Sequence, residues 1–360
     1  MHLVFETHAT TVDNENGIAT GWLPGELSEE GLDNARELGR RRRDDGLDVV
    51  ITSDLARAVQ TVDLAFAGAD VPILTDARLR EVDYGDLNGA PVEVIQRQRR
   101  SRIDTPFPGG QSYRETTDAM RGLLDELLRD RAGQRVLLVG HAATRFALDH
   151  ILTARPLEAA VVAPFAWREG WSYELTTERP RIAMLDGAGA TRSADELTLV
   201  YRSAFTAPGY DETEEKVLRF RDDQLPAHVG RDGFRCATLH VGGRLAGFAY
   251  GYTGARGQWW SDQLVEHAPQ PIVDAWVGGH FDFVALAVDP HWHGRGFGTA
   301  LHDALLLDLP HSRALLTTYR DDRPAPRLYR RLGWTLLHEG VFPDSDLWGL
   351  VLPQSSPDTH

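Results

Sequence analysis

The stretch Val284-Ala-Leu-Ala-Val-Asp-Pro-His-Trp-His-Gly-Arg-Gly-Phe-Gly-Thr-Ala300 carries the clearest structural signal in the chain. Its first five residues are apolar and suit a buried strand, which Asp289 and Pro290 end. Glycines at positions 294, 296 and 298 follow, and residues 301–307 have the composition of a helix. A strand, a glycine-rich turn and a helix can bind a phosphate, because glycines allow close approach and the first helical amides are unpaired. Glycine turns alone are a weak signal, since a purely structural corner has the same pattern.

The fuller pattern resembles the acetyl-CoA signature of the GNAT superfamily of N-acetyltransferases, in which a Leu-Ala-Val strand precedes Arg/Gln-x-x-Gly-x-Gly/Ala. Here the two parts fall on Leu286–Val288 and His293–Gly298, with His293 where the family usually has Arg or Gln. A second element, Arg327-Leu-Tyr-Arg-Arg-Leu-Gly-Trp334, is similar to the family's Leu-Tyr-x-x-x-Gly-Phe. The resemblance implies an acetyl-CoA site formed by Leu286, Ala287, Val288, His293, Gly294, Arg295, Gly296, Phe297, Gly298, Thr299 and Asp322.

The same resemblance implies a mechanism. In that family two strands of the site splay apart, the pantetheine arm pairs with the signature strand, and the amine attacks the thioester without an acyl-enzyme. Tyr329 would protonate the departing thiolate, although a tyrosine packed between helix and sheet fits the same position. The first candidate for the general base is Asp282 and the second is His280, and an exposed strand end is the alternative for both.

The acceptor is suggested only by composition. Residues 211–215 and 259–276 are rich in carboxylates, and the second stretch also holds tryptophans. Carboxylates beside aromatic rings suit a cationic amine. In a chain this acidic, such a run is also the usual composition of a solvated face.

The bulk composition limits the class of protein. The chain has 360 residues, enough for about two domains, with 42% hydrophobic and 25% charged residues as in globular proteins. Its formal net charge of −15 argues against nucleic acid and anionic membranes as partners. No run has the length of a membrane span and the start lacks a basic signal-peptide head, so we expect a cytoplasmic protein. The single cysteine, Cys236, excludes an intrachain disulfide and a cysteine zinc cluster; we expect no metal and place Cys236 in the core.

The first half alternates strands with helices, which predicts a mainly parallel sheet with functional residues just past the strand ends. Four motifs resemble those of the histidine phosphatase (phosphoglycerate mutase-like) superfamily over residues 1–185. They are Ser53–Thr61, Leu79–Gly85, Pro108–Ser112 and Val136–Ala142. The resemblance implies that His8 is a nucleophile that attacks phosphorus, that Arg57 and His141 hold the phosphate, and that Glu81 is the proton donor.

The first motif of that superfamily, Leu-Val-Arg-His-Gly-x-Thr, is altered in this chain. Thr7 stands where the motif has Arg, and Ala9 stands where it has Gly. Loss of a bidentate arginine should cost about 1.5–3 kcal/mol for each charge-assisted hydrogen bond. Two interpretations therefore stay open: a slow phosphatase, or a degenerate domain kept for binding or scaffolding.

The sequence thus predicts an α/β fusion. Residues 1–187 form a three-layer, phosphoglycerate mutase-like domain with a mainly parallel sheet, which residues 170–185 close as a hairpin. Residues 188–193 form a linker, and residues 194–360 form an α+β GNAT domain with a mixed sheet. The expected partners are acetyl-CoA, a small-molecule amine and, for the first domain, a phosphorylated small molecule; a homodimer stays open.

We expect the protein to be an N-acetyltransferase that acts on a small-molecule amine, with a role in antibiotic metabolism suggested by the pairing of domains. One alternative is a bifunctional enzyme whose main activity is that of a phosphatase. The other is a sensor or scaffold that binds acetyl-CoA without turnover.

Overall fold

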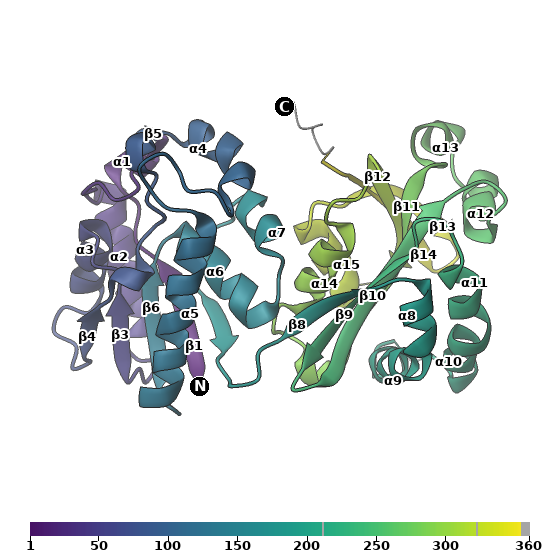
Figure 1. The fold of residues 1–360 in the computed structure, drawn as a ribbon, viewed down its shortest axis with the longest axis horizontal. Coiled ribbons are helices and arrows are strands. Elements are labelled where there is room, and N and C mark those ends of the chain that lie inside the picture. The colour runs from purple at the N-terminus through teal and green to yellow at the C-terminus, as the bar shows by residue number, and fades with distance from the viewer. Residues whose placement is uncertain (211, 322, 354–360) are drawn as a thin grey trace. The chain divides into compact units, whose positions relative to one another are not determined.

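The computed structural model describes residues 1–210, 212–321 and 323–353. The chain divides into two compact units, Met1–Arg179 and Pro180–His360, each with its own main sheet (Figure 1). No helix in the described part of the chain is long and apolar enough to cross a membrane.

The first unit contains, in chain order, β1 (His2–Thr7), α1 (Val12–Glu15), β2 (Ile18–Ala19), α2 (Glu29–Arg42), β3 (Val49–Thr52), α3 (Ala56–Ala65), β4 (Ile73–Thr75), η1 (Ala77–Leu79), η2 (Gly85–Leu87), β5 (Ala90–Pro91), α4 (Val92–Gln98), η3 (Arg100–Arg102), α5 (Tyr113–Asp130), β6 (Arg135–Gly140), α6 (Ala142–Thr153), α7 (Leu157–Val162) and β7 (Trp171–Glu174).

The main sheet of this unit has the order β4-β3-β6-β1-β7. Strands β4, β3, β6 and β1 are parallel, and β7 pairs antiparallel with β1. Successive side chains of a strand point to opposite faces, so each face meets its own layer of helices. On β1, Leu3 and Phe5 join the core that includes α5 and α6, whereas Val4 joins the core that includes α2 and α3. The predicted three-layer arrangement is confirmed.

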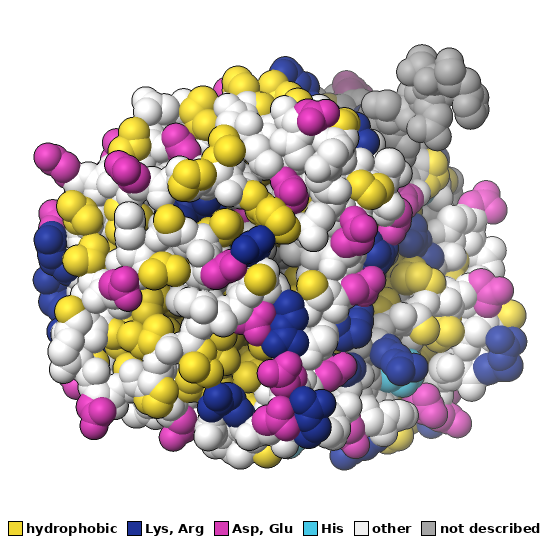
Figure 2. All heavy atoms as spheres, turned by 60° about the vertical axis from the view of Figure 1, so that its left-hand side comes forward, with side chains coloured by type: hydrophobic (Ala, Val, Ile, Leu, Met, Phe, Trp, Pro, Cys, Tyr) yellow, Lys and Arg dark blue, Asp and Glu magenta, His cyan; other side chains and the backbone are white. Residues whose placement is uncertain are grey.

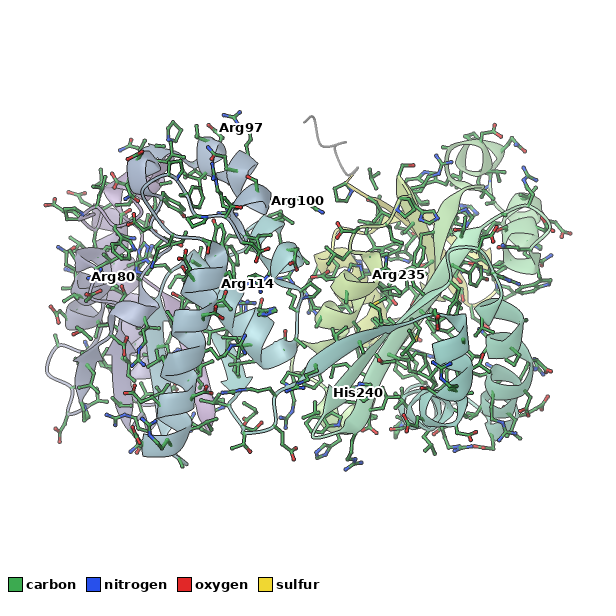
Figure 3. The ribbon with its side chains drawn as sticks, viewed as in Figure 1. Arg80, Arg97, Arg100, Arg114, Arg235 and His240 are labelled. Carbon is green, nitrogen blue, oxygen red and sulfur yellow. The ribbon has the colours of Figure 1, made fainter. Side chains whose placement is uncertain are left out.

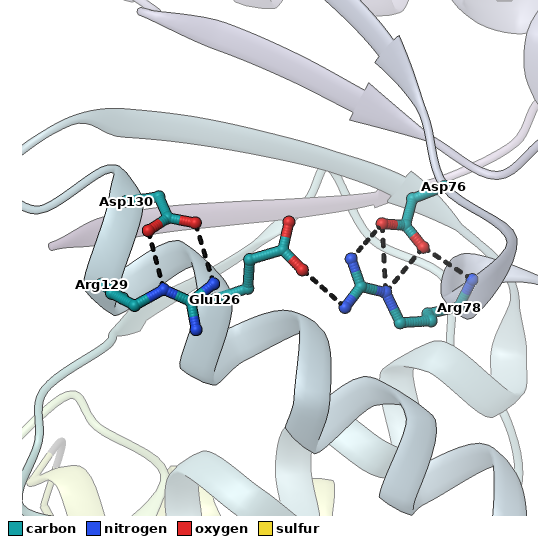
Figure 4. Close-up of polar contacts among 5 residues, drawn as sticks. All are labelled: Asp76, Arg78, Glu126, Arg129 and Asp130. Atoms are coloured by element: carbon teal, nitrogen blue, oxygen red, sulfur yellow. Dashed lines mark hydrogen bonds and ion pairs between the residues drawn. The ribbon is translucent and has the colours of Figure 1, made fainter.

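Opposite charges are mixed on the surface. Figure 2 shows acidic and basic side chains interspersed on one face of the molecule. In the group drawn in Figure 4, Arg78 donates to Asp76 at 2.6–3.1 Å and to Glu126 of α5 at 2.9 Å. Next to it, Arg129 pairs with Asp130 at 2.8 and 2.9 Å. The pairs made by Arg78 tie η1, the segment that leads to Glu81, to the long helix α5.

The second unit contains β8 (Arg181–Leu185), α8 (Gly187–Arg192), α9 (Ala194–Phe205), α10 (Glu214–Arg219), the π-helical turn η4 (Phe220–Gln224), α11 (Leu225–Val229), β9 (Arg235–Val241), β10 (Arg244–Gly254), α12 (Trp259–His267), α13 (Gln270–Trp276), β11 (His280–Val288), η5 (Pro290–Trp292), α14 (Phe297–Leu306), β12 (Arg313–Tyr319), α15 (Pro324–Arg331), β13 (Thr335–Phe342) and β14 (Ser345–Val351).

Its seven-stranded sheet has the order β13-β14-β12-β11-β10-β9-β8 and is mixed, as predicted. Among the described strands of this sheet, only β11 and β12 pair in parallel. One face packs against α14 and α15 around Phe283 and Leu301, and the other packs against α9 and η4 around Phe248 and Tyr250. Cys236 is fully buried in the second of these cores, where it was predicted to lie.

The pairing of β11 with β12 covers only Phe281 with Ala314 and Asp282 with Leu315, although both strands continue. The predicted splay between the two strands is therefore present. On the other side of β11, Ala285 is opposite Tyr250 and Phe283 is opposite Gly251, so Val284 is an extra, bulged residue. A bulge redirects the strand and increases its twist, which helps the two strands to separate.

The boundary between the units differs from the prediction. Strand β7 pairs with β1 and β8 pairs with β9, so residues 170–185 contribute to two sheets instead of closing one as a hairpin. The predicted linker, residues 188–193, lies largely in α8, whose N-cap Asp186 accepts a hydrogen bond from the amide of Gly189. Small residues serve close packing here, because a Cβ atom at Gly187 would overlap the carbonyl oxygen of Val229. The units divide earlier, at Arg179–Pro180.

Arg235, labelled on β9 in Figure 3, holds the end of helix α14. Its guanidinium donates to the carbonyl oxygens of Leu307 at 3.0 Å and Ala304 at 3.2 Å. The last carbonyls of a helix have no partner inside the helix, and a cation there also opposes the helix dipole.

We predict that Arg235→Met lowers the free energy of unfolding of the second unit by about 1–3 kcal/mol, because it leaves these carbonyls unpaired. Urea denaturation of the full chain, followed by circular dichroism, measures the change. Arg244→Met is the matched control, since Arg244 is exposed at the start of β10. Equal stability of the two variants would contradict the capping role.

Candidate active sites

In the first unit, the side chains predicted to act on a phosphate come together at one edge of the sheet. Strands β1 and β6 are paired up to Thr7 and Gly140, so the residues that follow, His8 and His141, leave the sheet side by side. Their ring centroids lie 4.9 Å apart. Arg57, in the first turn of α3, donates from Nε to His8 Nε2 and from Nη2 to His141 Nδ1, both at 3.3 Å.

The hydrogen bonds define the tautomer of His8. Its Nδ1 lies 2.7 Å from the carbonyl oxygen of Ala9, which can only accept, so Nδ1 carries the proton and Nε2 keeps its lone pair. Burial, and then the charge of Arg57, lower the pKa of His8 to about 3. The imidazole is therefore neutral at pH 7, and the lone pair of Nε2 accepts from Arg57 Nε. This is the form that can attack phosphorus.

His141 has the opposite arrangement. Because Nδ1 accepts from Arg57, the proton lies on Nε2, and this buried atom has no hydrogen-bond partner among the described residues. Burial, with the nearby Arg57 and His8, lowers the pKa of His141 well below its usual value. A neutral ring with an unused N–H group can donate to an oxygen of a bound phosphate.

The side chain of Glu81 lies near Arg57 and meets the first amides of α6. Its carboxylate accepts from the amides of Val82 at 2.9 Å, Ala142 at 3.2 Å and Ala143 at 3.2 Å. Burial nevertheless raises the pKa of Glu81, so the carboxyl group takes up a proton more readily than an exposed glutamate. A carboxyl group of this kind can serve as a proton donor.

Thr7 is paired with Gly140 at the end of β1, one residue before His8. A threonine at this position supplies no cation, so Arg57 is the arginine that contacts both histidines in the described structure. The Arg57 guanidinium also donates to the carbonyl oxygens of Gly21 at 2.8 Å and Leu23 at 3.2 Å. They orient the guanidinium toward the histidines.

In the second unit, the glycine-rich turn leads from β11 into α14. Gly294 and Gly296 have φ values of +76° and +81°, which residues other than glycine rarely adopt. Helix α14 starts at Phe297, earlier than predicted, and its first amides have no carbonyl one turn before them. The turn and helix therefore form the anion-binding geometry expected from the sequence.

The side chains of this turn have mostly structural contacts. His293 Nε2 lies 2.9 Å from the carbonyl oxygen of Val288, and Arg295 stacks on Trp292 at 5.0 Å. Phe297 is buried in the core, whereas Gly298 and Thr299 are half-buried in the first turn of α14. A phosphate would consequently meet backbone amides here. Asp322, the remaining predicted contact, lies outside the described residues.

The signature strand offers a free edge. From Phe283 to Val288, β11 has no pairing with β12, while its other edge pairs with β10. The segment Leu286–Val288, predicted to pair with pantetheine, lies in this part. An unpaired strand edge can accept an extended, amide-containing ligand through backbone hydrogen bonds.

Asp282 and His280, the two candidates for the base, have different surroundings. Asp282 is 4% exposed and lines a pocket, and burial raises its pKa to about 7 against the opposing hydrogen bond from Tyr252. His280 is fully buried, accepts from the amide of Gly278 at 3.1 Å and is not among the pocket residues. The geometry favours Asp282, because a carboxyl group that titrates near neutral pH can exchange a proton with a substrate.

The pocket measures 330 Å³, the lower end of the usual range for small-molecule sites. It lies where β11 and β12 separate and is lined by Gln224, His228, Arg231, Tyr252, Trp259, Trp260, Asp282, Phe283, Val284 and Thr317. Sequence reasoning missed Gln224, His228 and Arg231. They come from η4, α11 and the turn after α11, where the helical register changes, so no regular periodicity marks them.

The acidic stretches are not part of this pocket. Trp259 and Trp260 line it, but Asp262, Glu266 and Asp274 are exposed on α12 and α13. Residues 212–215 are also absent from its lining, and Asp211 lies outside the described residues. Asp282 supplies the carboxylate among the described lining residues.

Tyr329 lies on α15, 6% exposed, with its ring against Phe283 and Trp334 at 6.0 and 5.8 Å. Burial raises its pKa, so the hydroxyl keeps its proton at neutral pH. The ring is packed between helix and sheet, and the role of the hydroxyl as a proton donor stays a prediction. Among the described residues, no group of three or more His, Cys, Asp or Glu side chains could hold a metal ion.

We predict that His8 keeps the Nδ1–H tautomer and does not titrate between about pH 5 and 8. In Arg57→Met, its pKa should rise, because a neighbouring cation disfavours the charged ring, yet it should stay below the ordinary 6.5, because burial remains. Histidine ¹⁵N chemical shifts against pH measure both effects. Arg80→Met is the control, since Arg80 pairs with Asp54. A wild-type His8 that titrates at its ordinary value would contradict the prediction.

Comparison with known proteins agrees with this division into two sites. Residues 3–167 match the model of the histidine phosphatase superfamily (branch 1), and residues 195–334 match that of the acetyltransferase (GNAT) family. The 2,3-bisphosphoglycerate-dependent phosphoglycerate mutase of Bradyrhizobium sp. strain BTAi1 is 32% identical over 203 residues, 52% of this chain and 98% of the mutase. The enzyme of the same name from Methylobacterium sp. strain 4-46 is 34% identical over 169 residues, 42% of this chain and 79% of the mutase.

Among solved structures, Bacillus stearothermophilus YhfR is 23% identical, with a TM-score of 0.45, over 49% of this chain and 92% of that one. From the two family models and the 32% identity to a mutase covered over 98% of its length, the chain belongs to the histidine phosphatase superfamily through its first unit and is a two-domain fusion with a GNAT family acetyltransferase domain.

Proposed function

We propose that the second unit transfers an acetyl group from acetyl-CoA to the amine of a small molecule. The observation that carries the proposal is the divergence of β11 and β12, which places a free strand edge, a phosphate-binding turn and the Asp282 pocket along one strand. The free edge suits the amide-containing arm of acetyl-CoA, and the amides at the start of α14 suit its pyrophosphate. This reaction would take place in the cytoplasm.

The residues have defined roles in this proposal. The Asp282 carboxylate takes a proton from the ammonium group of the acceptor, and the free amine attacks the thioester carbonyl. A nitrogen–carbon bond forms, the carbon–sulfur bond breaks, and the Tyr329 hydroxyl gives its proton to the departing thiolate. The attacking nitrogen then loses its extra proton, which returns Tyr329 to its hydroxyl form and leaves a neutral amide. Burial supports both roles, because it raises the pKa of Asp282 to about 7 and keeps Tyr329 protonated.

The acceptor is proposed only as a class. The pocket volume suits a small molecule, and the described carboxylates of the acidic stretches are absent from its lining, which removes the argument that they bind a cationic amine. The fusion with a phosphatase-like unit supports the further proposal that both units act on one compound, as in antibiotic metabolism. A sensor that binds acetyl-CoA without transfer remains the competing function.

The first measurement is calorimetric titration with acetyl-CoA, followed by thiol release against a panel of amines. We expect binding, and amine-dependent release whose kcat/KM rises with pH through about 7, because the base must be ionised. Asp282→Asn should lower kcat/KM by about 10²–10⁴-fold and remove this ascending limb. Asp274→Asn, on the exposed face of α13, is the matched control. Absence of acetyl-CoA binding would refute the proposal, and binding without release would favour the sensor.

A second candidate function, slow phosphate-ester hydrolysis by the first unit, is favoured by the tautomer of His8. Its Nε2 is unprotonated and carries a lone pair that accepts from Arg57, His141 presents an unused N–H group, and Glu81 lies nearby as a donor. The missing element is the arginine that Thr7 replaces. We infer that the unit binds a phosphorylated small molecule and turns it over slowly.

We expect Thr7→Arg to increase p-nitrophenyl phosphate hydrolysis by about 10- to 100-fold, since it restores a charge-assisted contact with the phosphoryl oxygens. His8→Ala should abolish the activity in both backgrounds, because no other group forms the phosphohistidine. Thr7→Gln controls for side-chain size without charge. Phosphate release that survives His8→Ala would show that the unit does not use this histidine.

A further inference from the structure

The acceptor pocket contains a cation without a carboxylate partner. Arg231 is half-buried, and its guanidinium carbon lies 4.4 Å from the ring centroid of Tyr252. Among the described residues, no carboxylate lies within ion-pair distance of it, and its side chain makes no hydrogen bond. Other arginines of this unit do pair with a carboxylate, as Arg202 does with Glu214 and Arg323 with Asp321. The stacking on Tyr252 holds the guanidinium plane while its N–H groups stay available.

The other polar residues of the pocket do not neutralise Arg231. Asp282 is close enough for Arg231 to lower its pKa, but burial is the larger effect, so this carboxyl group is only partly ionised at pH 7. His228 accepts or donates at the Tyr250 hydroxyl at 3.1 Å, and burial lowers its pKa to about 4, so it is neutral. The pocket therefore has a permanent positive charge and a titrating acid.

Acetyl-CoA does not account for this charge. The pyrophosphate site proposed above lies after Val288, whereas Arg231 lines the pocket beside Asp282. On β11, Asp282 and Val288 are about 20 Å apart, at about 3.3 Å per residue. The arm that would lie along β11 between them is uncharged, so the anion that Arg231 suits must belong to the acceptor.

The walls of the pocket add a second preference. Trp259 and Trp260, at the start of α12, and Phe283, on β11, contribute aromatic surface. Trp259 is 71% exposed, which is unusual for so large an apolar side chain and places it at the open side of the pocket. An aromatic or bulky apolar group on the acceptor would cover it.

We propose that the acceptor is an amino acid or a similar compound, with an oxyanion next to its amine and an aromatic or bulky apolar group. Arg231 binds the oxyanion and Asp282 faces the amine. The two side chains line one pocket, so one small molecule can contact both. This inference rests on the proposed acetyl transfer for the identity of the amine site, but the anion preference can be measured without turnover.

The test uses pairs of ligands that differ only in the anion: phenylalanine with phenethylamine, and tryptophan with tryptamine. Equilibrium binding to the full chain is measured by calorimetry in the presence of CoA, and thiol release from acetyl-CoA is measured in parallel. We expect the acid-bearing member to bind about 10- to 100-fold more tightly, the range of one charge-assisted hydrogen bond. Phosphoethanolamine with ethanolamine forms a third pair, which separates a phosphate from a carboxylate.

Arg231→Gln should remove the preference, and Arg231→Lys should keep part of it, because lysine retains the charge but not the planar fork. Arg244→Gln, an exposed arginine on the same unit, is the matched control and should keep all of it. Unchanged binding of acetyl-CoA shows that each variant is folded.

Equal binding of the two members of every pair, or a preference that survives Arg231→Gln, would overturn the inference while leaving acetyl transfer intact. Failure of every acid-bearing probe to bind at millimolar concentration would also overturn it. An Arg231-dependent preference without thiol release would support the anion site and refute the proposed transfer. A preference seen only with the phosphate pair would support the site and identify the anion as a phosphate.

Discussion

The second unit depends on a stretch of β11 whose backbone N–H and C=O groups have no strand partner on one edge in the described structure. Strands β11 and β12 share two paired positions and then part, although backbone N–H and C=O groups inside a sheet are otherwise almost always paired. The fold can sustain this gap because the bulge at Val284 turns β11 and because α14 and α15 pack the same face from the core side. Water or a ligand must complete the exposed edge, so the weakest part of the sheet is also the part suited to binding.

The same gap positions the chemistry. Asp282 lies at the last paired position, so its backbone is held by the sheet while its side chain faces the pocket that opens beyond it. Burial beside Tyr252 raises its pKa into the neutral range, whereas a carboxylate at an exposed strand end would be ionised throughout. Arg231 lines the same pocket, and its charge lowers the pKa of Asp282. The two side chains do not form an ion pair, so the effect of burial on this pKa stays the larger one.

Burial also disfavours the charged forms in the first unit. Its two histidines are kept neutral by burial and by the guanidinium of Arg57, whereas burial raises the pKa of Glu81 against the opposing charge of Arg57. A single arginine contacts both neutral imidazoles, and the site has less positive charge than the superfamily's first motif would provide. In both units, burial is thus the largest influence on the pKa values of these titratable groups.

Much of the fold and of the two candidate sites could be predicted from the sequence, because these features depend on local motifs. The signature Leu286–Val288 and the glycines after it encode a strand and a tight turn. The four motifs of the first half place Arg57, Glu81 and His141 in a parallel α/β unit, and the altered first motif adds His8. The boundary between the units could not be predicted, because the small residues of α8 read as a linker until the close contact with Val229 is known. The pocket partners Arg231 and His228 were also missed, since the π-helical turn η4 breaks the periodicity that would have placed them on one helix face. Motifs determine which backbone forms, but pKa values and unpaired charges depend on neighbours distant in the chain, which only the tertiary structure brings together.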